Sequence, residues 1–405
     1  MKEKLLAITG KAVNPISLSA TALIAIYIRG PQFFEAPRIW AEEGRIYLQN
    51  ALENQTLLSF LTPHLGYYSL FNKISILFAA EAFPLKHAAL VTTLFSAALQ
   101  IWTCLIIYSC SGRLARNKIH RFFLALLPVF LSDPEVWLNT INGHFWLATG
   151  TYFVLNSEKI TRSQILYIFL AFMTGVSSLF FLPYFMLRAA NEKTKQLFAI
   201  TAIGGMATVI QLSSLFATSL GGKNRFNPEY LSNIPNGIME TLTPYAHDGL
   251  QLKIAFLIYI AFAVYIFAKN LIKHNDKLGP VYGIISLLTY TILSIISSHH
   301  MAGGVRYGTP VYIGLLAIAI SNLFLAKNIG RQKFYIACTI LLIASKIAAF
   351  FNSNMYYWHS EPGWRQQIQK RKCDQEAQIS IFPPGWKTTL PKYSGIECRS
   401  GNFSE

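Results

Sequence analysis

The sequence predicts an all-α integral membrane protein with about 11 transmembrane helices. Of its 405 residues, 53% are hydrophobic and only 13% are charged, whereas a soluble domain carries about 25% charged residues. Apolar runs recur along nearly the whole chain, and many of the Lys and Arg residues stand in short segments between them. This composition excludes a soluble enzyme, a disordered protein and a small secreted disulfide scaffold. We therefore interpret the net charge of +16 as basic residues that orient the spans of a membrane protein, and we expect no nucleic-acid partner.

The apolar runs define the candidate spans, several of which are short enough to be broken or tilted. They cover roughly residues 13–30, 88–110, 119–132, 137–155, 164–177, 179–187, 196–217, 251–268, 280–298, 306–326 and 333–351. The first has a basic start, but Ile28-Arg29-Gly30-Pro31 offers no small-residue cleavage site. We therefore expect it to stay as an anchor.

The distribution of basic residues orients the spans. The N-terminus and five loops, predicted to be cytoplasmic, together hold 18 Lys and Arg, whereas the opposite short loops near 133–136 and 178 hold none. The five loops are 111–121, 156–164, 188–195, 269–279 and 327–333. The positive-inside rule then predicts a cytoplasmic N-terminus and an outward C-terminus. Within a transmembrane module of residues 1–351, the loops 30–87 and 218–250 would project outward, followed by an outward tail at 352–405.

The orientation depends on residues 66–83, which we expect to lie along the membrane. One helical face would carry apolar residues and another would carry polar ones, as an interfacial helix requires. The apolar face comprises Leu70, Phe71, Ile74, Leu77 and Phe78, and the polar one Ser69, Asn72 and Lys73. A stretch of about 17 residues could instead span the bilayer, but every later basic loop would then lie outside.

The outward first loop contains an acidic pair, Glu42 and Glu43. If residues 38–50 form a helix, Trp40, Gly44 and Tyr47 share one face and both carboxylates lie on the other, toward an aqueous cleft. Crowded carboxylates near apolar surface have raised pKa values, which suits a general base. The alternative is a solvated loop helix whose charges only keep it soluble.

Two further polar clusters could bind a substrate. One contains His64 and Tyr67, and the other contains Asn142, His144 and Trp146. Polar groups at membrane depth are costly unless they line a cavity. Asn142 and His144 could hydrogen-bond a sugar, and Trp146 could stack on one. Hydrogen bonds between helices and an interfacial aromatic belt are the alternative explanation.

Arg306 stands at the outward start of a late span, where the positive-inside rule disfavours a basic residue. It follows Gly303-Gly304, and a guanidinium beside such a turn can hold a phosphate through two hydrogen bonds. Tyr307 and His300 are expected to assist it. An arginine that reaches from the lipid interface into water is the alternative.

The cysteines predict one disulfide and no metal site. Cys373 and Cys398 both lie in the outward tail, where an oxidising exterior allows them to pair. No Cys-x-x-Cys or His/Cys spacing indicates zinc.

Together these features resemble the GT-C superfamily of integral-membrane glycosyltransferases, which use polyprenyl-phosphate sugars. Trp40-Ala41-Glu42-Glu43-Gly44-Arg45 looks like the family's acidic motif in the first outward loop, in which one carboxylate is the catalytic base. Residues 139–146, Arg306-Tyr307 with Pro310, and Pro383-Pro384-Gly385-Trp386 resemble motifs of bacterial members. The size is similar to that of serotype-converting glucosyltransferases.

The resemblance implies transfer of a hexose such as glucose to a cell-envelope glycan, for example lipopolysaccharide O-antigen, outside a bacterial inner membrane. Arg306 would hold the donor phosphate, and Glu42 or Glu43 would deprotonate the acceptor hydroxyl for direct, inverting displacement. No nucleotide site or other cofactor is expected, although the carboxylates could ligate a divalent cation as in some members. The competing hypotheses are a transporter or flippase of lipid-linked glycans, for which paired halves would be typical, and a glycan polymerase.

Overall fold

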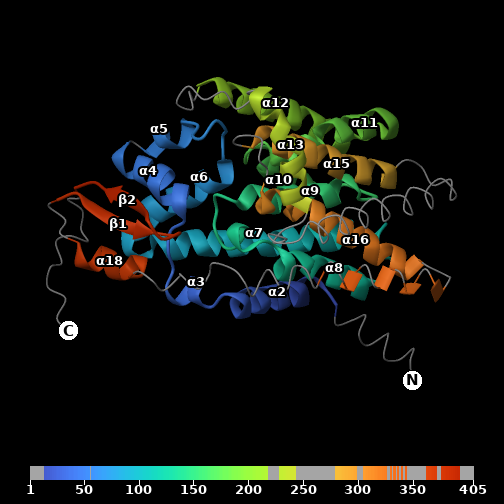
Figure 1. The fold of residues 1–405 in the computed structure, drawn as a ribbon, viewed down its shortest axis with the longest axis horizontal. Coiled ribbons are helices and arrows are strands. Elements are labelled where there is room, and N and C mark those ends of the chain that lie inside the picture. The colour runs from blue at the N-terminus through green and yellow to red at the C-terminus, as the bar shows by residue number, and fades with distance from the viewer. Residues whose placement is uncertain are drawn as a thin grey trace.

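A computed structural model describes most of the chain and shows a mainly helical protein (Figure 1). The described residues are 13–54, 56–217, 228–242, 279–298, 304–325, 362–371 and 375–392, with a few helical residues between 329 and 343. The predicted all-α class is confirmed for the bulk of these residues. The predicted span 251–268 and most of 333–351 lie outside the described residues.

The helices fall into a bundle and a smaller group at one end of it (Figure 1). The bundle helices are α2 (Pro15–Arg29), α7 (Ala88–Cys110), α8 (Lys118–Leu131), α9 (Gly143–Leu155), α10 (Arg162–Phe172), α11 (Leu182–Glu192), α12 (Lys195–Ala217), α13 (Ile234–Leu242), α15 (Gly279–Ser297) and α16 (Thr309–Leu325). The first loop adds α3 (Gln32–Glu35), the π-helix η1 (Glu43–Leu48), α4 (Gln49–Glu53), α5 (Thr56–Leu61), α6 (Leu70–Leu77), the π-helix η2 (Phe78–Ala82) and η3 (Leu85–His87).

Local sequence signals explain where several helices begin. The Asn14 side chain accepts hydrogen bonds from the backbone N–H groups of Ile16 and Ser17 at the start of α2. Thr161 and Gln164 form a reciprocal capping box at the start of α10. Such caps satisfy backbone donors that have no partner inside the helix.

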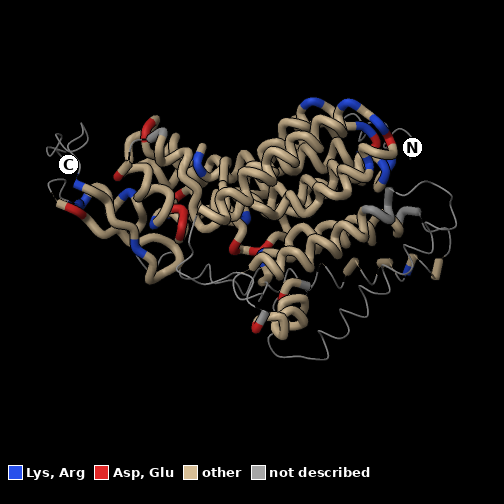
Figure 2. The backbone as a smooth tube through the Cα atoms, turned by 90° about the horizontal axis from the view of Figure 1, so that it is seen from above, with Lys and Arg blue, Asp and Glu red and all other residues tan. Residues whose placement is uncertain are grey.

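Successive helices from α7 to α12 run in opposite directions, so that the described loops 111–121, 156–164 and 188–195, all predicted to be cytoplasmic, meet at one end of the bundle. The Tyr108 hydroxyl near the end of α7 lies 3.5 Å from the carbonyl oxygen of Val13, just before α2. Gln164 Nε2 lies 3.1 Å from Cys110 Sγ. Figure 2 shows Lys and Arg gathered over one end of the bundle, at the upper right of the view, which we call the basic end, while the middle of the bundle is almost free of charge.

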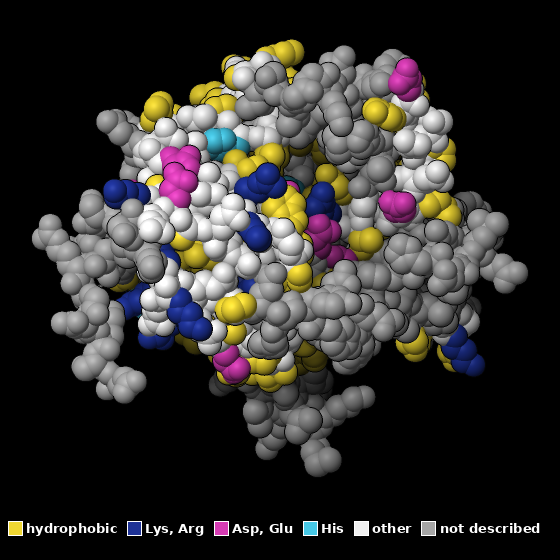
Figure 3. Space-filling view, turned by 60° about the vertical axis from the view of Figure 1, so that its left-hand side comes forward, with side chains coloured by type: hydrophobic (Ala, Val, Ile, Leu, Met, Phe, Trp, Pro, Cys, Tyr) yellow, Lys and Arg dark blue, Asp and Glu magenta, His cyan; other side chains and the backbone are white. Residues whose placement is uncertain are grey.

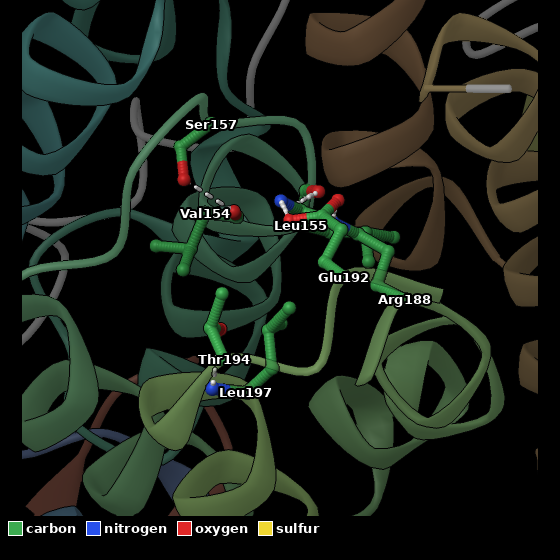
Figure 4. A network of polar contacts seen from close by, with 7 residues as sticks. All are labelled: Val154, Leu155, Ser157, Arg188, Glu192, Thr194 and Leu197. Atoms are coloured by element: carbon green, nitrogen blue, oxygen red, sulfur yellow. Dashed lines mark hydrogen bonds and ion pairs between the residues drawn. The ribbon is translucent and has the colours of Figure 1, made fainter. Parts of the chain in front are cut away.

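The basic end is held together by a polar network (Figure 4). Arg188 is buried; its Nη1 donates to the carbonyl oxygen of Leu155 at 2.5 Å and its Nε pairs with Glu192 at 2.7 Å. The Ser157 hydroxyl donates to the carbonyl oxygen of Val154 at 2.9 Å. The bond from Arg188 to Leu155 joins the end of α11 to the end of α9, and both bonds satisfy carbonyls in the last turn of α9, which lack partners within the helix.

The predicted number of about 11 spans is not shown. Among the described residues, two helices are long and apolar enough to cross a membrane, Leu85–Cys110 and Lys195–Ala217. The predicted spans 119–132, 137–155 and 164–177 correspond to helices of 14, 13 and 11 residues, whereas a span needs about 20. Before α9, residues 137–142 of the predicted span form an irregular loop that contains Asn139, Thr140 and Asn142.

The outer surface of the bundle carries exposed apolar side chains. On α2, Ile16 is 81% and Ile28 is 73% exposed, and on α12 Phe216 is 83% exposed. A soluble protein covers most such side chains, and large exposed apolar surfaces mark contact with a partner or a membrane.

Residues 66–83 form α6 and η2, with the polar face turned inward. Asn72 and Lys73 are buried, while Phe78 is 44% exposed. The sequence predicted an amphipathic helix here, but with the polar face toward water. The helix α6 has eight residues and measures about 12 Å, too short to cross a bilayer. The start of α2 lies beside the end of α7, so the loop between these two helices begins and ends at the other end of the bundle.

The tail contains a small element that the all-α prediction missed. Helix α18 (Trp364–Lys370) is followed by an antiparallel hairpin of β1 (Ala377–Ile381) and β2 (Trp386–Leu390). Ile379 and Ile381 alternate with more exposed residues, as a half-buried strand requires. The hairpin turns at Pro383-Pro384-Gly385, where Gly385 has a φ of +89°. In the described part of the tail, the hairpin lies beside η1 and α4 of the first loop, and α18 lies beside η3 (Figure 1).

Candidate functional site

A cavity of about 360 Å³ opens at the end of the bundle opposite the basic end. The start of α9, the end of α15 and the short turn before α16 meet there, together with residues 175–177 and the acidic segment, defined as residues 40–45. Figure 3 looks at this end and shows acidic and basic side chains beside a hollow. The lining residues are Glu42, Leu65, Tyr67, Ile141, Asn142, His144, Phe145, Gly175, Val176, Ser177, Ser297, Arg306 and Tyr307.

The two adjacent glutamates occupy different environments, contrary to the expectation that both face a cleft. Glu42 is partly exposed and lines the cavity. Glu43 is 1% exposed and points into the protein. Successive helical residues are rotated by about 100°, and the backbone turns from α-helical to π-helical geometry at Glu43. Hence only Glu42 can meet a molecule in the cavity.

Buried Glu43 joins the acidic segment to the loop before α9. One of its carboxyl oxygens, Oε2, accepts from the backbone N–H of Trp40 at 3.1 Å. The other, Oε1, accepts from the backbone N–H of Thr140 at 2.9 Å and contacts the Thr140 hydroxyl. Burial raises the pKa of Glu43, while these hydrogen bonds oppose the rise. Glu43 is therefore a structural link between two segments far apart in the sequence.

The Thr140 hydroxyl lies between two acceptors, because its oxygen is also 2.5 Å from Oδ1 of Asn72. A hydroxyl has one proton and can donate to only one of them. A proton on Glu43, which burial favours, would let Glu43 donate to Thr140 while Thr140 donates to Asn72. In the second arrangement the side-chain amide of Asn72 is rotated so that its oxygen and nitrogen exchange places. Asn72 then donates to the Thr140 hydroxyl, and the hydroxyl donates to an ionised Glu43. The two arrangements differ by one proton.

Arg306 lines the cavity and forms an ion pair that the sequence analysis missed. Its Nη1 lies 2.5 Å from Oε1 of Glu135, and the two side chains are 39% and 43% exposed. Glu135 belongs to a short 3₁₀ turn in which Asp133 accepts from the Glu135 backbone N–H at 2.8 Å. The sequence does show an acidic residue in the short loop 133–136, but that loop was considered only for its lack of Lys and Arg.

Three of the predicted substrate-binding residues line the cavity: Tyr67, Asn142 and His144. Asn142 also supports the loop, since its Nδ2 donates to the carbonyl oxygen of Glu135 at 2.9 Å. The rings of Tyr67 and His144 meet edge to face at a centroid distance of 6.1 Å. Tyr307 also lines the cavity, next to Arg306 in the sequence.

Trp146 does not reach the cavity. It is 1% exposed, its Nε1 donates to the carbonyl oxygen of Val136 at 2.8 Å, and it packs on Trp137. The prediction that Trp146 stacks on a sugar is therefore corrected to a packing role, because the predicted span begins as a loop and moves Trp146 into the core.

His64 also lies away from the cavity lining. Its ring contacts Tyr47 edge to face at 5.0 Å, near Lys73, whose Nζ donates to the carbonyl oxygen of Ser59 at 2.7 Å. Burial, with a smaller contribution from Lys73, lowers the pKa of His64 to about 4. His64 is therefore neutral at physiological pH and helps to pack the polar face of α6.

The cavity wall includes residues that sequence reasoning did not single out. Gly175 has a φ of +78°, and a Cβ there would lie 3.5 Å from the His144 ring. Its N–H donates to the carbonyl oxygen of Tyr68 at 2.9 Å. Ser177 of the same segment and Ser297 at the end of α15 add hydroxyl groups. A lone glycine or serine in an apolar run carries no distinctive sequence signal.

His300 and both cysteines of the predicted disulfide, Cys373 and Cys398, lie outside the described residues. Among the residues that the structure does describe, no three His, Cys, Asp or Glu side chains are grouped so as to hold a metal ion.

Comparison with known proteins finds neither a matching family model nor a matching curated protein.

Proposed function

We propose that this protein is a membrane glycosyltransferase that moves a hexose from a polyprenyl-phosphate donor to a cell-envelope glycan. The observation that carries the proposal is that Glu42 and Arg306, far apart in the sequence, line one cavity. A carboxylate and a guanidinium at one hollow suit a reaction that needs a base for the acceptor and a cation for a phosphate leaving group.

The different environments of the two glutamates support Glu42 as the base. Glu42 deprotonates the acceptor hydroxyl, whose oxygen attacks the anomeric carbon while the bond from that carbon to the phosphate oxygen breaks. The polyprenyl phosphate leaves with the bonding electron pair, and the anomeric centre is inverted. Glu43 takes no part in these steps because its oxygens are occupied by Trp40 and Thr140.

Arg306 holds the donor phosphate in this proposal. One of its nitrogens already pairs with Glu135, but a guanidinium has five N–H donors in a fork. The ion pair keeps the guanidinium at the cavity before the donor arrives. Tyr67, Asn142 and His144 then line the part of the cavity that receives the sugar.

The proposed membrane location is supported by charge and by exposed apolar surface. Lys and Arg gather at the basic end, the middle of the bundle is nearly uncharged (Figure 2), and α2 and α12 present apolar side chains outward. The positive-inside rule would put the basic end in the cytoplasm and the cavity outside the inner membrane.

The test is sugar transfer by the purified protein in lipid nanodiscs. The donor probe is undecaprenyl phosphate carrying radiolabelled glucose, and the acceptor is lipopolysaccharide. We expect label in the lipopolysaccharide, and a Glu42→Gln variant should transfer about 10²–10⁴-fold more slowly. Glu53→Gln, at an exposed carboxylate further along the first loop, is the matched control.

Equal rates for wild type and Glu42→Gln would refute Glu42 as the base. A wild type that moves the labelled lipid between the leaflets of a vesicle without transferring the sugar would instead support the flippase hypothesis.

A further inference from the structure

We propose that the C-terminal hairpin positions Glu42, with Thr388 and Phe382 as positioning residues; this inference rests on the proposed function. The hairpin belongs to the tail, more than 300 residues from the acidic segment. The two nevertheless pair through their backbones (Figure 1 shows β1 and β2 beside the first loop).

The pairing lies directly beside Glu42. The Ala41 N–H donates to the carbonyl oxygen of Phe382 at 2.5 Å, and the Phe382 N–H donates to the carbonyl oxygen of Ile39 at 2.9 Å. Trp40 and Phe382 form a parallel bridge, and their rings lie 4.8 Å apart. The backbone just before Glu42 is thus paired with the hairpin much as one strand of a sheet is paired with the next.

A second contact holds the residues after Glu42. The buried Thr388 hydroxyl donates to the carbonyl oxygen of Gly44 at 2.9 Å. That carbonyl also accepts from the backbone N–H of Gln49 within η1, and a carbonyl oxygen has two lone pairs, so it can take both donors. Gly44 is packed so closely that a Cβ would come within 2.9 Å of both Ile381 and Ile39.

The tail is anchored independently of this pairing. Trp364 is 1% exposed, and its Nε1 donates to the carbonyl oxygen of Leu85 at 2.8 Å. Gln367 both donates to the carbonyl oxygen of Ser380 and accepts from its N–H. The hairpin is therefore a fixed support on both sides of Glu42, and a displacement of about 1 Å at a catalytic group can cost 10²-fold in rate.

The experiment removes one positioning contact and compares structure with catalysis. Thr388→Val keeps the shape but loses the hydroxyl, and Thr388→Ser keeps the hydroxyl. Thr389→Val, on the opposite face of the same strand, is the matched control. Each full-length variant is studied in nanodiscs by hydrogen–deuterium exchange of residues 39–48 and by the transfer assay with the undecaprenyl-phosphate glucose probe.

For Thr388→Val we expect faster exchange over residues 39–48, and kcat reduced about 10- to 100-fold with the donor KM changed less than about 3-fold. Thr388→Ser should restore kcat, and Thr389→Val should match wild type. Faster exchange with an unchanged kcat would overturn the positioning role while leaving the proposed function intact. Unchanged exchange and an unchanged kcat would overturn the contact itself. If wild type transfers no sugar, the proposed function fails, and with it the role of Thr388 in positioning a base.

Discussion

The two ends of the bundle satisfy their charged groups in different ways. At the basic end, Arg188 is paired within its own helix and with the neighbouring carbonyl of Leu155 (Figure 4). At the cavity, Arg306 pairs with Glu135 across 171 positions of the chain and stays 39% exposed. Arg188 thus satisfies carbonyl groups at helix ends, whereas Arg306 remains at the cavity, where a ligand can reach it.

The comparison predicts that Arg306 matters for donor binding. Arg306→Ala should raise the donor KM by about 10- to 100-fold, because a hydrogen bond to a charged group contributes about 1.5–3 kcal/mol. Arg306→Lys should recover only part of this, since it keeps the charge but loses the fork. The measurement is transfer kinetics with the undecaprenyl-phosphate glucose probe. A wild-type KM for Arg306→Ala would show that the cation serves only Glu135.

Arg188 should matter for stability instead. Arg188→Met keeps the aliphatic packing but removes the bonds to Leu155 and Glu192, which should lower the free energy of unfolding by about 2–3 kcal/mol. Activity per folded molecule should stay unchanged. Thermal unfolding in detergent measures the loss. Lys195→Met, at an exposed position nearby, should stay within about 0.5 kcal/mol of wild type. Equal free energies of unfolding for Arg188→Met and Lys195→Met would contradict a stabilising role for Arg188.

Glu43→Gln should change kcat by less than about 10-fold, and it should cost about 1–2 kcal/mol of stability because the amide cannot accept from both Thr140 and Trp40. The pKa of Glu43 is raised in the folded protein. Its contribution to stability is therefore fully present below the unfolded pKa and is lost as the pH rises through the folded value. Glutamine does not titrate, so the stability gap between the variant and wild type should narrow with rising pH. A gap that widens would indicate an ionised, stabilising Glu43.

The sequence determined the features that depend on local pattern. The helical class follows from long apolar runs, and the meeting of the described basic loops 111–121, 156–164 and 188–195 at one end follows from alternating helix direction and short connections. The acidic segment and Arg306 could be singled out because charged residues are scarce in this chain. Each of these features can be predicted from the composition or the spacing of residues within one stretch of the chain.

Only the tertiary structure decided which polar residues share a site. Adjacent Glu42 and Glu43 are equivalent in the sequence, but Thr140 and Trp40 bury one of them and leave the other at the cavity. The ion pair of Arg306 with Glu135 and the pairing of Phe382 with Ala41 join segments that no local pattern connects. Their free energy comes from packing and hydrogen bonds between distant elements, which exist only after the chain has folded.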